Sequence, residues 1–289
     1  MALSGRDAFR GELTSIAHRD GRVVCLETWS PYRDHPFEAA HPERFFSLPS
    51  GGPVLAQMVT GLVAAGFRPF VVVGPGGTAP ARAVGNRWLW RACVEAGATV
   101  VLPPEGSGEG SVEVRQKTCV PLAVPCGEEE TRAMVRQVAR SRRPYCLVLG
   151  DRPGPLWPYR PNGAGNKVPL VADELGLSAG TGARLVSVGE AGTRLALATR
   201  ATAPGLGHVH LVYLDEVRLA AAAAELALWP GPSVVTAAAW MLEEVLRALR
   251  ARTPGHAVSG VLAASHQGQA DVAEVLAAVA AFGGSSGRA

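Results

Sequence analysis

The stretch RFFSLPSGGPVLAQMVTGLVAAGFRPFVVV, residues 44–73, contains the pattern from which the fold class is predicted. A short apolar segment with two phenylalanines comes first, and Gly51-Gly52-Pro53 then begins a helix. Proline is favoured in a first helical turn, and Gly66 can take the left-handed conformation that ends a helix after Ala65. The continuous apolar run at 70–73 is typical of a strand buried in a parallel sheet. The stretch therefore predicts a strand, a helix and a second strand in succession.

The same alternation of strands and helices continues on both sides of this stretch. Strands separated by helices favour a doubly wound, mostly parallel α/β sheet. Cys25 and Cys146 lie inside two of the apolar segments, so we expect them to be small core residues. The further predicted strands are residues 22–26, 98–102, 119–124 and 145–149, and the predicted helices are residues 5–18 and 128–140.

A second and smaller α/β set follows residues 151–182, which are rich in proline and glycine and are interpreted as a linker or surface loop. We therefore predict two α/β domains, residues 1–165 and 166–289, and a disordered tail after residue 282. The predicted strands of the second domain are residues 184–188, 210–214, 233–237 and 260–262, and its predicted helices are residues 220–228, 241–250 and 269–282.

Composition excludes several classes of protein. Of the 289 residues, 47% are hydrophobic and 18% charged, which is typical of a globular protein with a sizeable core. The net charge of +3 and the lack of a basic stripe argue against nucleic-acid binding. No apolar run reaches the roughly 18 residues of a membrane span, and the polar N-terminus is not a signal peptide. Five scattered cysteines without a CxxC pair predict no metal site and a cytoplasmic, reducing environment.

Four segments together resemble the transketolases and related thiamine-diphosphate enzymes. They are HPERFF at 41–46, GLVAAGFRPF at 61–70, VPCGEEETR at 124–132 and PYCLVLG at 144–150. The resemblance is clear over residues 5–150 and weaker over 183–282. It implies a pyrimidine-binding domain followed by a transketolase C-terminal domain, which mainly builds the dimer in this family. The family's diphosphate-binding module, with its Gly-Asp-Gly motif, is absent, and Gly150-Asp151 is not that motif. The chain thus resembles the C-terminal section of a split transketolase.

The resemblance implies a partner and a cofactor. The partner would be a diphosphate-binding chain of the transketolase N-terminal type, in a dimer or an α2β2 heterotetramer. That partner would hold most of the thiamine diphosphate and its Mg²⁺. The reaction implied is transfer of a two-carbon ketol or acyl unit between small molecules, in specialised metabolism.

One departure from the family decides how this chemistry is interpreted. In the family, a glutamate at the start of the helix after the Phe-Phe strand hydrogen-bonds the aminopyrimidine and helps to form the reactive ylid. An ungapped match from Arg44 to Gly61 places Gly52 at that position. Losing one acid–base group commonly lowers a rate by about 10²–10⁴. A heteromeric enzyme with a degenerate site and a non-catalytic subunit that stabilises or regulates a homologous partner both remain open.

The resemblance also predicts the residues that line the cofactor. The family's aromatic residues after the next strand are replaced by Val73-Gly74-Pro75-Gly76-Gly77, and its substrate-handling histidine is missing from residues 106–116. Residues 74–79 approximate a dinucleotide loop, but Pro75 removes a backbone donor, so a tight turn is favoured. The predicted cofactor-lining residues are Ser50, Gly51, Gly52, Gly74, Gly76 and Gly77.

The catalytic residues stay unknown from sequence, and three side chains are weak candidates for replacing the missing acid or binding substrate. Glu27 ends the first predicted strand at the carboxyl edge of the sheet, where a structural role is equally supported. Glu109 and Arg115 belong to a loop that borders the same region. His208 and His210 share one strand face, but without ligand spacing they are interpreted as part of a half-exposed strand.

Overall fold

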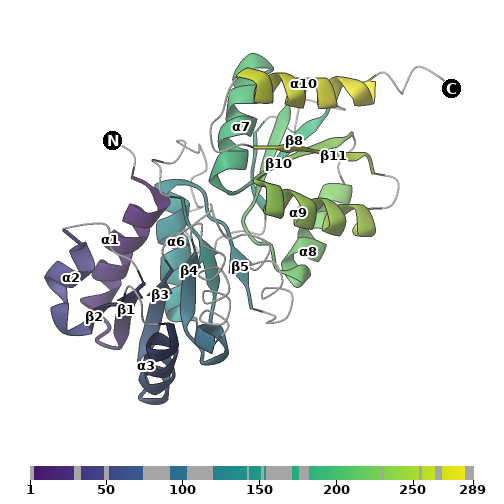
Figure 1. Ribbon diagram of the computed structural model, residues 1–289. Helices are drawn as coiled ribbons and strands as arrows, with labels where there is room; N and C mark the ends of the chain where they lie inside the picture. Colours follow the sequence, from purple (N-terminus) through teal and green to yellow (C-terminus); the bar gives the residue numbers. More distant parts are fainter. Residues whose placement is uncertain are drawn as a thin grey trace. The chain divides into compact units, whose positions relative to one another are not determined.

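The computed structural model describes residues 3–28, 34–48, 52–73, 92–102, 120–141, 143–150, 153, 171–175, 182–228, 231–253, 256–263 and 269–283. The chain divides into two compact units, Met1–Val168 and Pro169–Ala289 (Figure 1). Among the helices in these ranges, none has the length and apolar character needed to cross a membrane.

The first unit contains a parallel sheet. Its described strands follow the order β2-β1-β3-β4-β6-β5, and every pair of neighbours is parallel. β1 and β4 are buried along their whole length, as expected for strands with helices on both faces. This arrangement confirms the doubly wound sheet predicted from sequence. The strands are β1 (Val23–Glu27), β2 (Phe45–Ser47), β3 (Arg68–Val72), β4 (Thr99–Leu102), β5 (Leu122–Ala123) and β6 (Cys146–Val148).

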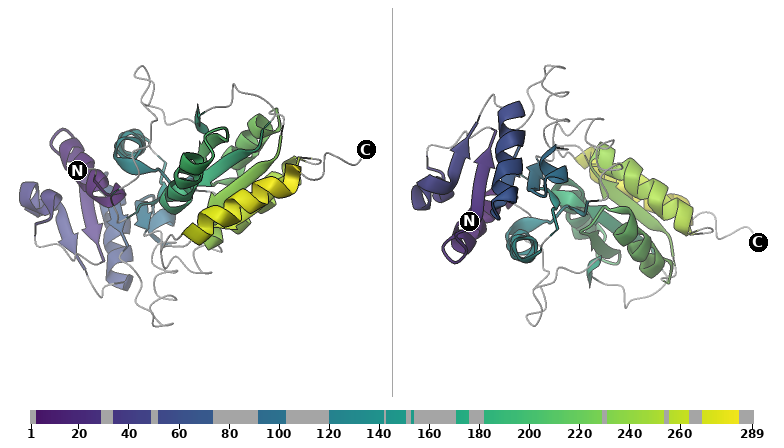
Figure 2. Two further views of the ribbon diagram at one scale, coloured as in Figure 1. Left: turned by 90° about the horizontal axis from the view of Figure 1, so that it is seen from above. Right: turned by 90° about the horizontal axis from the view of Figure 1, so that it is seen from below.

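Helices cover both faces of this sheet. The Ser4 side chain caps the first helix by accepting a hydrogen bond from the Asp7 backbone N–H at 3.1 Å. Gly66 has a φ of 84° just after the third helix, which is the left-handed helix end predicted for it. α1 and α6 pack together on one face, and α3 covers the other (Figure 2). The helices are α1 (Gly5–Ala17), α2 (Pro36–Ala40), the short 3₁₀ helix η1 (Pro42–Arg44), α3 (Gly52–Ala64) and α6 (Gly127–Arg140).

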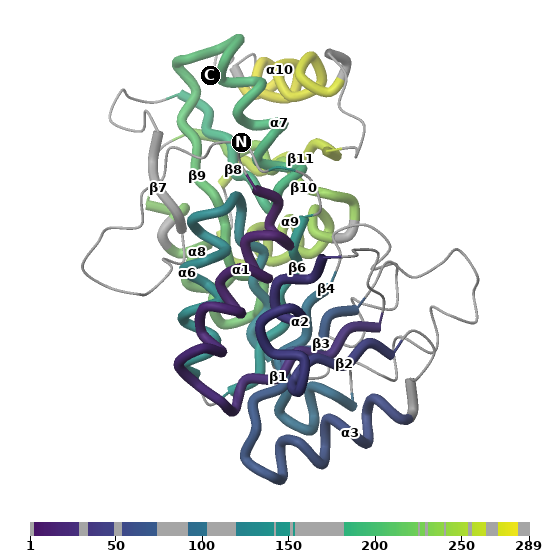
Figure 3. Tube along the Cα trace, turned by 90° about the vertical axis from the view of Figure 1, so that its left-hand side faces the viewer, coloured from purple at the N-terminus to yellow at the C-terminus, as the bar shows by residue number. Residues whose placement is uncertain are grey.

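The second unit is a smaller sheet whose described strands follow the order β11-β10-β8-β9-β7. All pairs are parallel except β7 with β9, which is antiparallel. α7 and α10 lie on one face and α8 and α9 on the other (Figure 1 and Figure 3). The strands are β7 (Val171–Leu175), β8 (Arg184–Val188), β9 (Gly207–Leu211), β10 (Ser233–Ala237) and β11 (Val258–Leu262), and the helices are α7 (Gly189–Thr202), α8 (Glu216–Ala227), α9 (Ala239–Arg252) and α10 (Gln269–Gly283).

Three local predictions in this region were wrong or incomplete. Residues 171–175 lie within the predicted linker but form β7, which pairs with β9 at one end of the described sheet. β9 is Gly207–Leu211, so it begins and ends three residues before the predicted strand at 210–214. α7 was not predicted at all, since its first turn contains two glycines, which are poor helix formers. The predicted disordered tail lies outside the described residues, apart from Gly283 at the end of α10.

Candidate functional site

The strand order of the first unit indicates where in its sheet a ligand site is expected. β1 is flanked by β2 on one side and β3 on the other. The connection from β1 to β2 and the connection from β2 to β3 therefore cross the sheet in opposite directions. In sheets of this kind, ligands bind at the carboxyl ends of the strands where that reversal occurs. The last residue of β1 is Glu27, which is in register with Val72 of β3 and Ser47 of β2. We therefore take Glu27 and its neighbours as the candidate site.

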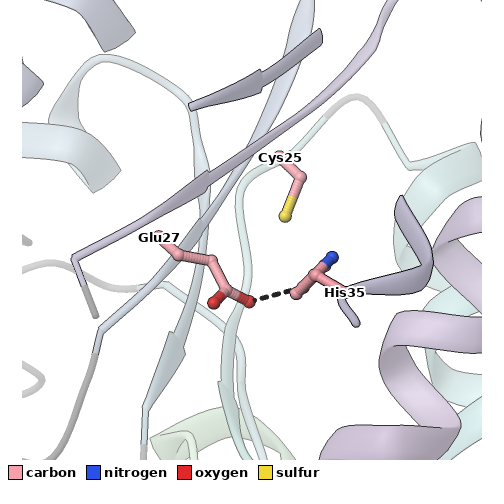
Figure 4. A group of neighbouring side chains, drawn as sticks. All are labelled: Cys25, Glu27 and His35. Atoms are coloured by element: carbon pink, nitrogen blue, oxygen red, sulfur yellow. Dashed lines mark hydrogen bonds and ion pairs between the residues drawn. The ribbon is translucent and has the colours of Figure 1, made fainter. Parts of the chain in front are cut away.

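Glu27 is fully buried and engaged by two basic side chains. Arg10 of α1 donates from Nε and Nη2 to Glu27 Oε1 at 3.3 and 3.2 Å, and from Nη2 to Oε2 at 3.3 Å. His35 Nε2 lies 2.9 Å from Glu27 Oε1 (Figure 4). All three side chains are at most 3% exposed. A buried carboxylate is stable only when it is paired and hydrogen-bonded, and here it is both.

The backbone around His35 indicates which of its two ring nitrogens carries the hydrogen. This residue precedes Pro36 and caps α2, where its Nδ1 accepts hydrogen bonds from the Phe37 and Glu38 backbone N–H groups at 3.2 and 3.4 Å. An atom that accepts two hydrogen bonds cannot carry a proton, so the hydrogen of the neutral ring is on Nε2. His35 therefore donates to Glu27, and this bond connects α2 to the end of β1.

Cys25 completes a group that has the composition of a metal site. Among the described residues, the ligand atoms of Cys25, Glu27 and His35 lie within 4.8 Å of one another. The hydrogen bonds nevertheless oppose a metal, because His35 Nε2 carries a proton and the Arg10 cation occupies the Glu27 carboxylate. Burial, followed by the adjacent Glu27 charge, raises the pKa of the Cys25 thiol well above its usual value. Arg10, Glu27 and His35 thus form a buried hydrogen-bonded network that connects α1, β1 and α2.

Of the predicted site residues, Glu27 and Gly52 lie within the described structure. α3 begins at Gly52 and has no acidic residue in its first turn. Glu27 is at the carboxyl edge, as expected, but both oxygens of its carboxylate already accept hydrogen bonds. The other predicted residues, Ser50, Gly51, Gly74, Gly76, Gly77, Glu109 and Arg115, lie outside the described residues.

Sequence reasoning missed Arg10 and His35. Arg10 is on the buried face of α1, next to Phe9 and Leu13, where an arginine needs a buried acidic partner. His35 stands directly before a proline that begins a helix, which is a capping position. Both signals were present in the sequence.

A second buried polar cluster lies in the second unit. Ser187 Oγ is 2.9 Å from His208 Nε2 and 3.2 Å from His210 Nδ1, and Thr193 Oγ1 donates to Ser187 Oγ at 3.1 Å. All four residues are fully buried, so the half-exposed strand predicted for the two histidines is wrong. A serine–histidine pair without solvent access cannot reach a substrate, and the cluster therefore has a structural role.

Comparisons with known proteins identify the fold. No protein-family model matches the chain, and no curated protein matches its sequence. A structure described as "Split gene transketolase, inactive beta4 tetramer" is similar with a TM-score of 0.73 and 19% identity, over 98% of this chain and 98% of that chain.

Two further transketolase structures are similar over part of their length. Transketolase from Leishmania mexicana has a TM-score of 0.66 and 14% identity, over 97% of this chain and 45% of that chain. Transketolase from Campylobacter jejuni has a TM-score of 0.63 and 13% identity, over 97% and 46%. The chain spans nearly all of the split-gene chain and just under half of the other two. Its fold is that of the C-terminal section of a transketolase-like protein.

Proposed function

We propose that the chain is one subunit of a split, transketolase-like, thiamine-diphosphate-dependent enzyme of the cytoplasm. The observation that carries this proposal is the match over nearly the full length of a split-gene transketolase chain, against less than half of two other transketolase chains. The missing half would be a separate diphosphate-binding chain, in a dimer or an α2β2 assembly. The activity proposed for the complex is transfer of a two-carbon ketol or acyl unit between small molecules.

On this proposal, the described residues lack the carboxylate that the resemblance leads us to expect at the pyrimidine end of the cofactor. The resemblance requires a carboxylate at the start of α3, and the chain has Gly52 there. Glu27, which is at the same edge of the sheet, already neutralises Arg10 and accepts from His35. The partner would then hold the diphosphate and Mg²⁺. This chain would contribute backbone around residues 50–52 and 74–77, and no proton-transferring side chain among the described residues.

This misfit supports a second candidate function, a non-catalytic subunit that stabilises or regulates a homologous partner. One similar structure is named as an inactive tetramer of β chains. We propose that the present chain is likewise inactive alone and associates with copies of itself.

Calorimetry with a purified N-terminal-type chain tests the enzyme proposal. Thiamine diphosphate and Mg²⁺ are titrated into this chain, into the partner chain and into their mixture. Tight cofactor uptake by the mixture alone is the expected result. A mixture that forms no complex, or that binds the cofactor no better than the partner alone, would leave only the non-catalytic function.

A further inference from the structure

The short helix α2 is held in the first unit by very few side chains. Of its five residues, only Phe37 is buried. The two residues that cap it are both buried histidines, His35 at the N-terminal end and His41 at the C-terminal end. A helix of this length is not stable in water without tertiary packing. The position of α2 therefore depends on Phe37 and on the two capping histidines.

The two capping histidines are hydrogen-bonded to groups of opposite charge. His35 Nε2 donates to the Glu27 carboxylate at 2.9 Å, at the carboxyl edge of the sheet (Figure 4). His41 Nδ1 lies 2.6 Å from Arg44 Nη2. A guanidinium can only donate hydrogen bonds, so His41 Nδ1 accepts and the His41 ring is neutral in this arrangement. Protonation of His41 is thus incompatible with its bond to Arg44.

Arg44 is fixed by the backbone around it. Its Nη1 donates to the carbonyl oxygens of Ala17, Asp20 and Val23 at 3.2, 3.3 and 3.4 Å. These carbonyls belong to the end of α1, the turn that follows and the start of β1. Because three backbone groups hold the guanidinium, a charge on His41 would displace the histidine, and with it the end of α2, rather than Arg44.

The other neighbours of His41 also oppose its protonation. The His18 ring at the end of α1 is edge-on to it, with centroids 4.5 Å apart, and α2 contributes the Phe37 ring at 5.3 Å. Within the described part of the chain, the titratable and charged groups near His41 are His18, Arg44 and Glu43. The Glu43 carboxylate is 65% exposed and paired with Arg44. Burial, and then the Arg44 and His18 charges, lower the pKa of His41 below its ordinary value of 6.5.

We propose that α2 is an acid-sensitive element, in which protonation of His41 breaks its bond to Arg44, releases α2 and removes the His35 hydrogen bond from Glu27. The released form binds a proton at His41 below pH 6.5 that the attached form does not bind. Attachment is therefore fully stable above pH 6.5 and is about tenfold weaker at pH 5.5. The inference concerns the carboxyl edge of the sheet in this chain alone, so it is independent of the proposed cofactor and partner.

Hydrogen exchange of the full chain, measured by mass spectrometry at pH 7.5 and 5.5 and corrected for intrinsic rates, tests this element. The backbone N–H groups of Ala39 and His41 are bonded to carbonyls four residues earlier and report on α2. Their protection should fall about tenfold in the native chain. His41→Asn should abolish the fall, because an amide oxygen can accept from Arg44 but does not titrate. His256→Asn is the matched control and should retain it, because His256 lies 3.3 Å from Arg184 in the second unit.

Equal protection of α2 at the two pH values in the native chain, or the same fall in His41→Asn, would overturn the proposal. Nuclear magnetic resonance of the ring nitrogens of His35 and His41 gives a second readout that needs no substitution. The His35 signals should change with the same midpoint as the protonation of His41. A His41 ring that is already charged at pH 7.5, or that titrates without any change at His35, would also overturn the proposal. Both measurements leave the calorimetric test of the enzyme function unaffected.

Discussion

At the scale of single residues, both units contain buried polar groups that are paired within the fold. Arg10, Glu27 and His35 form such a group in the first unit, and Ser187, Thr193, His208 and His210 form another in the second. A buried charge whose partner is removed is costly, and a buried neutral histidine opposes protonation.

Glu27→Gln should lower the free energy of unfolding by about 3–5 kcal/mol, because Arg10 would remain buried without its counter-charge. Urea denaturation measures this change. The control is Glu43→Gln, because the Glu43 carboxylate pairs with Arg44 but is 65% exposed. Such a surface pair contributes at most about 1 kcal/mol. Equal effects of the two substitutions would show that the Glu27 charge is not needed for stability.

His208 should make the second unit sensitive to acid. Burial, and then the neighbouring His210 and Arg200 charges, lower the pKa of His208 from 6.5 to about 3. Below pH 6.5 the unfolded chain therefore binds a proton at His208 that the folded chain does not bind. The contribution of neutral His208 to the free energy of unfolding is thus fully present above pH 6.5 and is lost progressively as the pH falls towards 3. The slope attributable to this group is about 1.4 kcal/mol per pH unit.

Urea denaturation between pH 7 and 5 measures this slope in the native chain and in His208→Gln. The variant should lose the contribution of His208 and keep the smaller ones of His41 and His256, whose pKa values are also lowered by burial. An identical slope in both proteins would mean that His208 is protonated in the folded state.

At the scale of elements, α7 and β10 approach each other closely in the second unit. Thr236 Oγ1 donates to the Gly192 carbonyl at 2.9 Å, and a Cβ added to Gly192 would overlap the Thr236 backbone carbonyl. Helix and strand can approach this closely only because residue 192 has no side chain.

Gly192→Ala should therefore destabilise the chain by about 3 kcal/mol, through separation of α7 from β10. Gly205→Ala is the control in the same unit, because an added Cβ there meets nothing within 4 Å. Thermal unfolding followed by circular dichroism compares the two. Equal melting temperatures would show that α7 can shift without loss of packing.

Sequence alone predicted the elements whose apolar patterns are strong and regular, such as β1, β3, α3 and α6. It missed α7 and the burial of His208 for the same reason, because glycines and histidines were interpreted by their average behaviour. In this fold Gly192 permits close packing, and His208 Nε2 forms a hydrogen bond with Ser187 Oγ. Such roles depend on residues far away in the chain, which a local pattern does not contain.

At the scale of the whole molecule, the fold and the candidate site were predictable to different degrees. The two-unit α/β architecture and the likeness to a transketolase C-terminal section followed from short motifs and alternating elements. The pairing of Glu27 did not, since it needs Arg10 from α1 and His35 from the start of α2. The prediction that Gly52 replaces the family's glutamate came from register alone, and α3 begins at that residue.

We propose that this chain is the pyrimidine-side half of a split transketolase-like enzyme whose site has lost its acid. The most direct measurement is turnover of a ketose phosphate by the complex with an N-terminal-type chain, comparing the native chain with Gly52→Glu and Gly52→Gln. We predict that the glutamate raises turnover by about 10²–10⁴ and that the glutamine, which cannot exchange a proton, does not. Unchanged or lower turnover with Gly52→Glu would contradict this proposal.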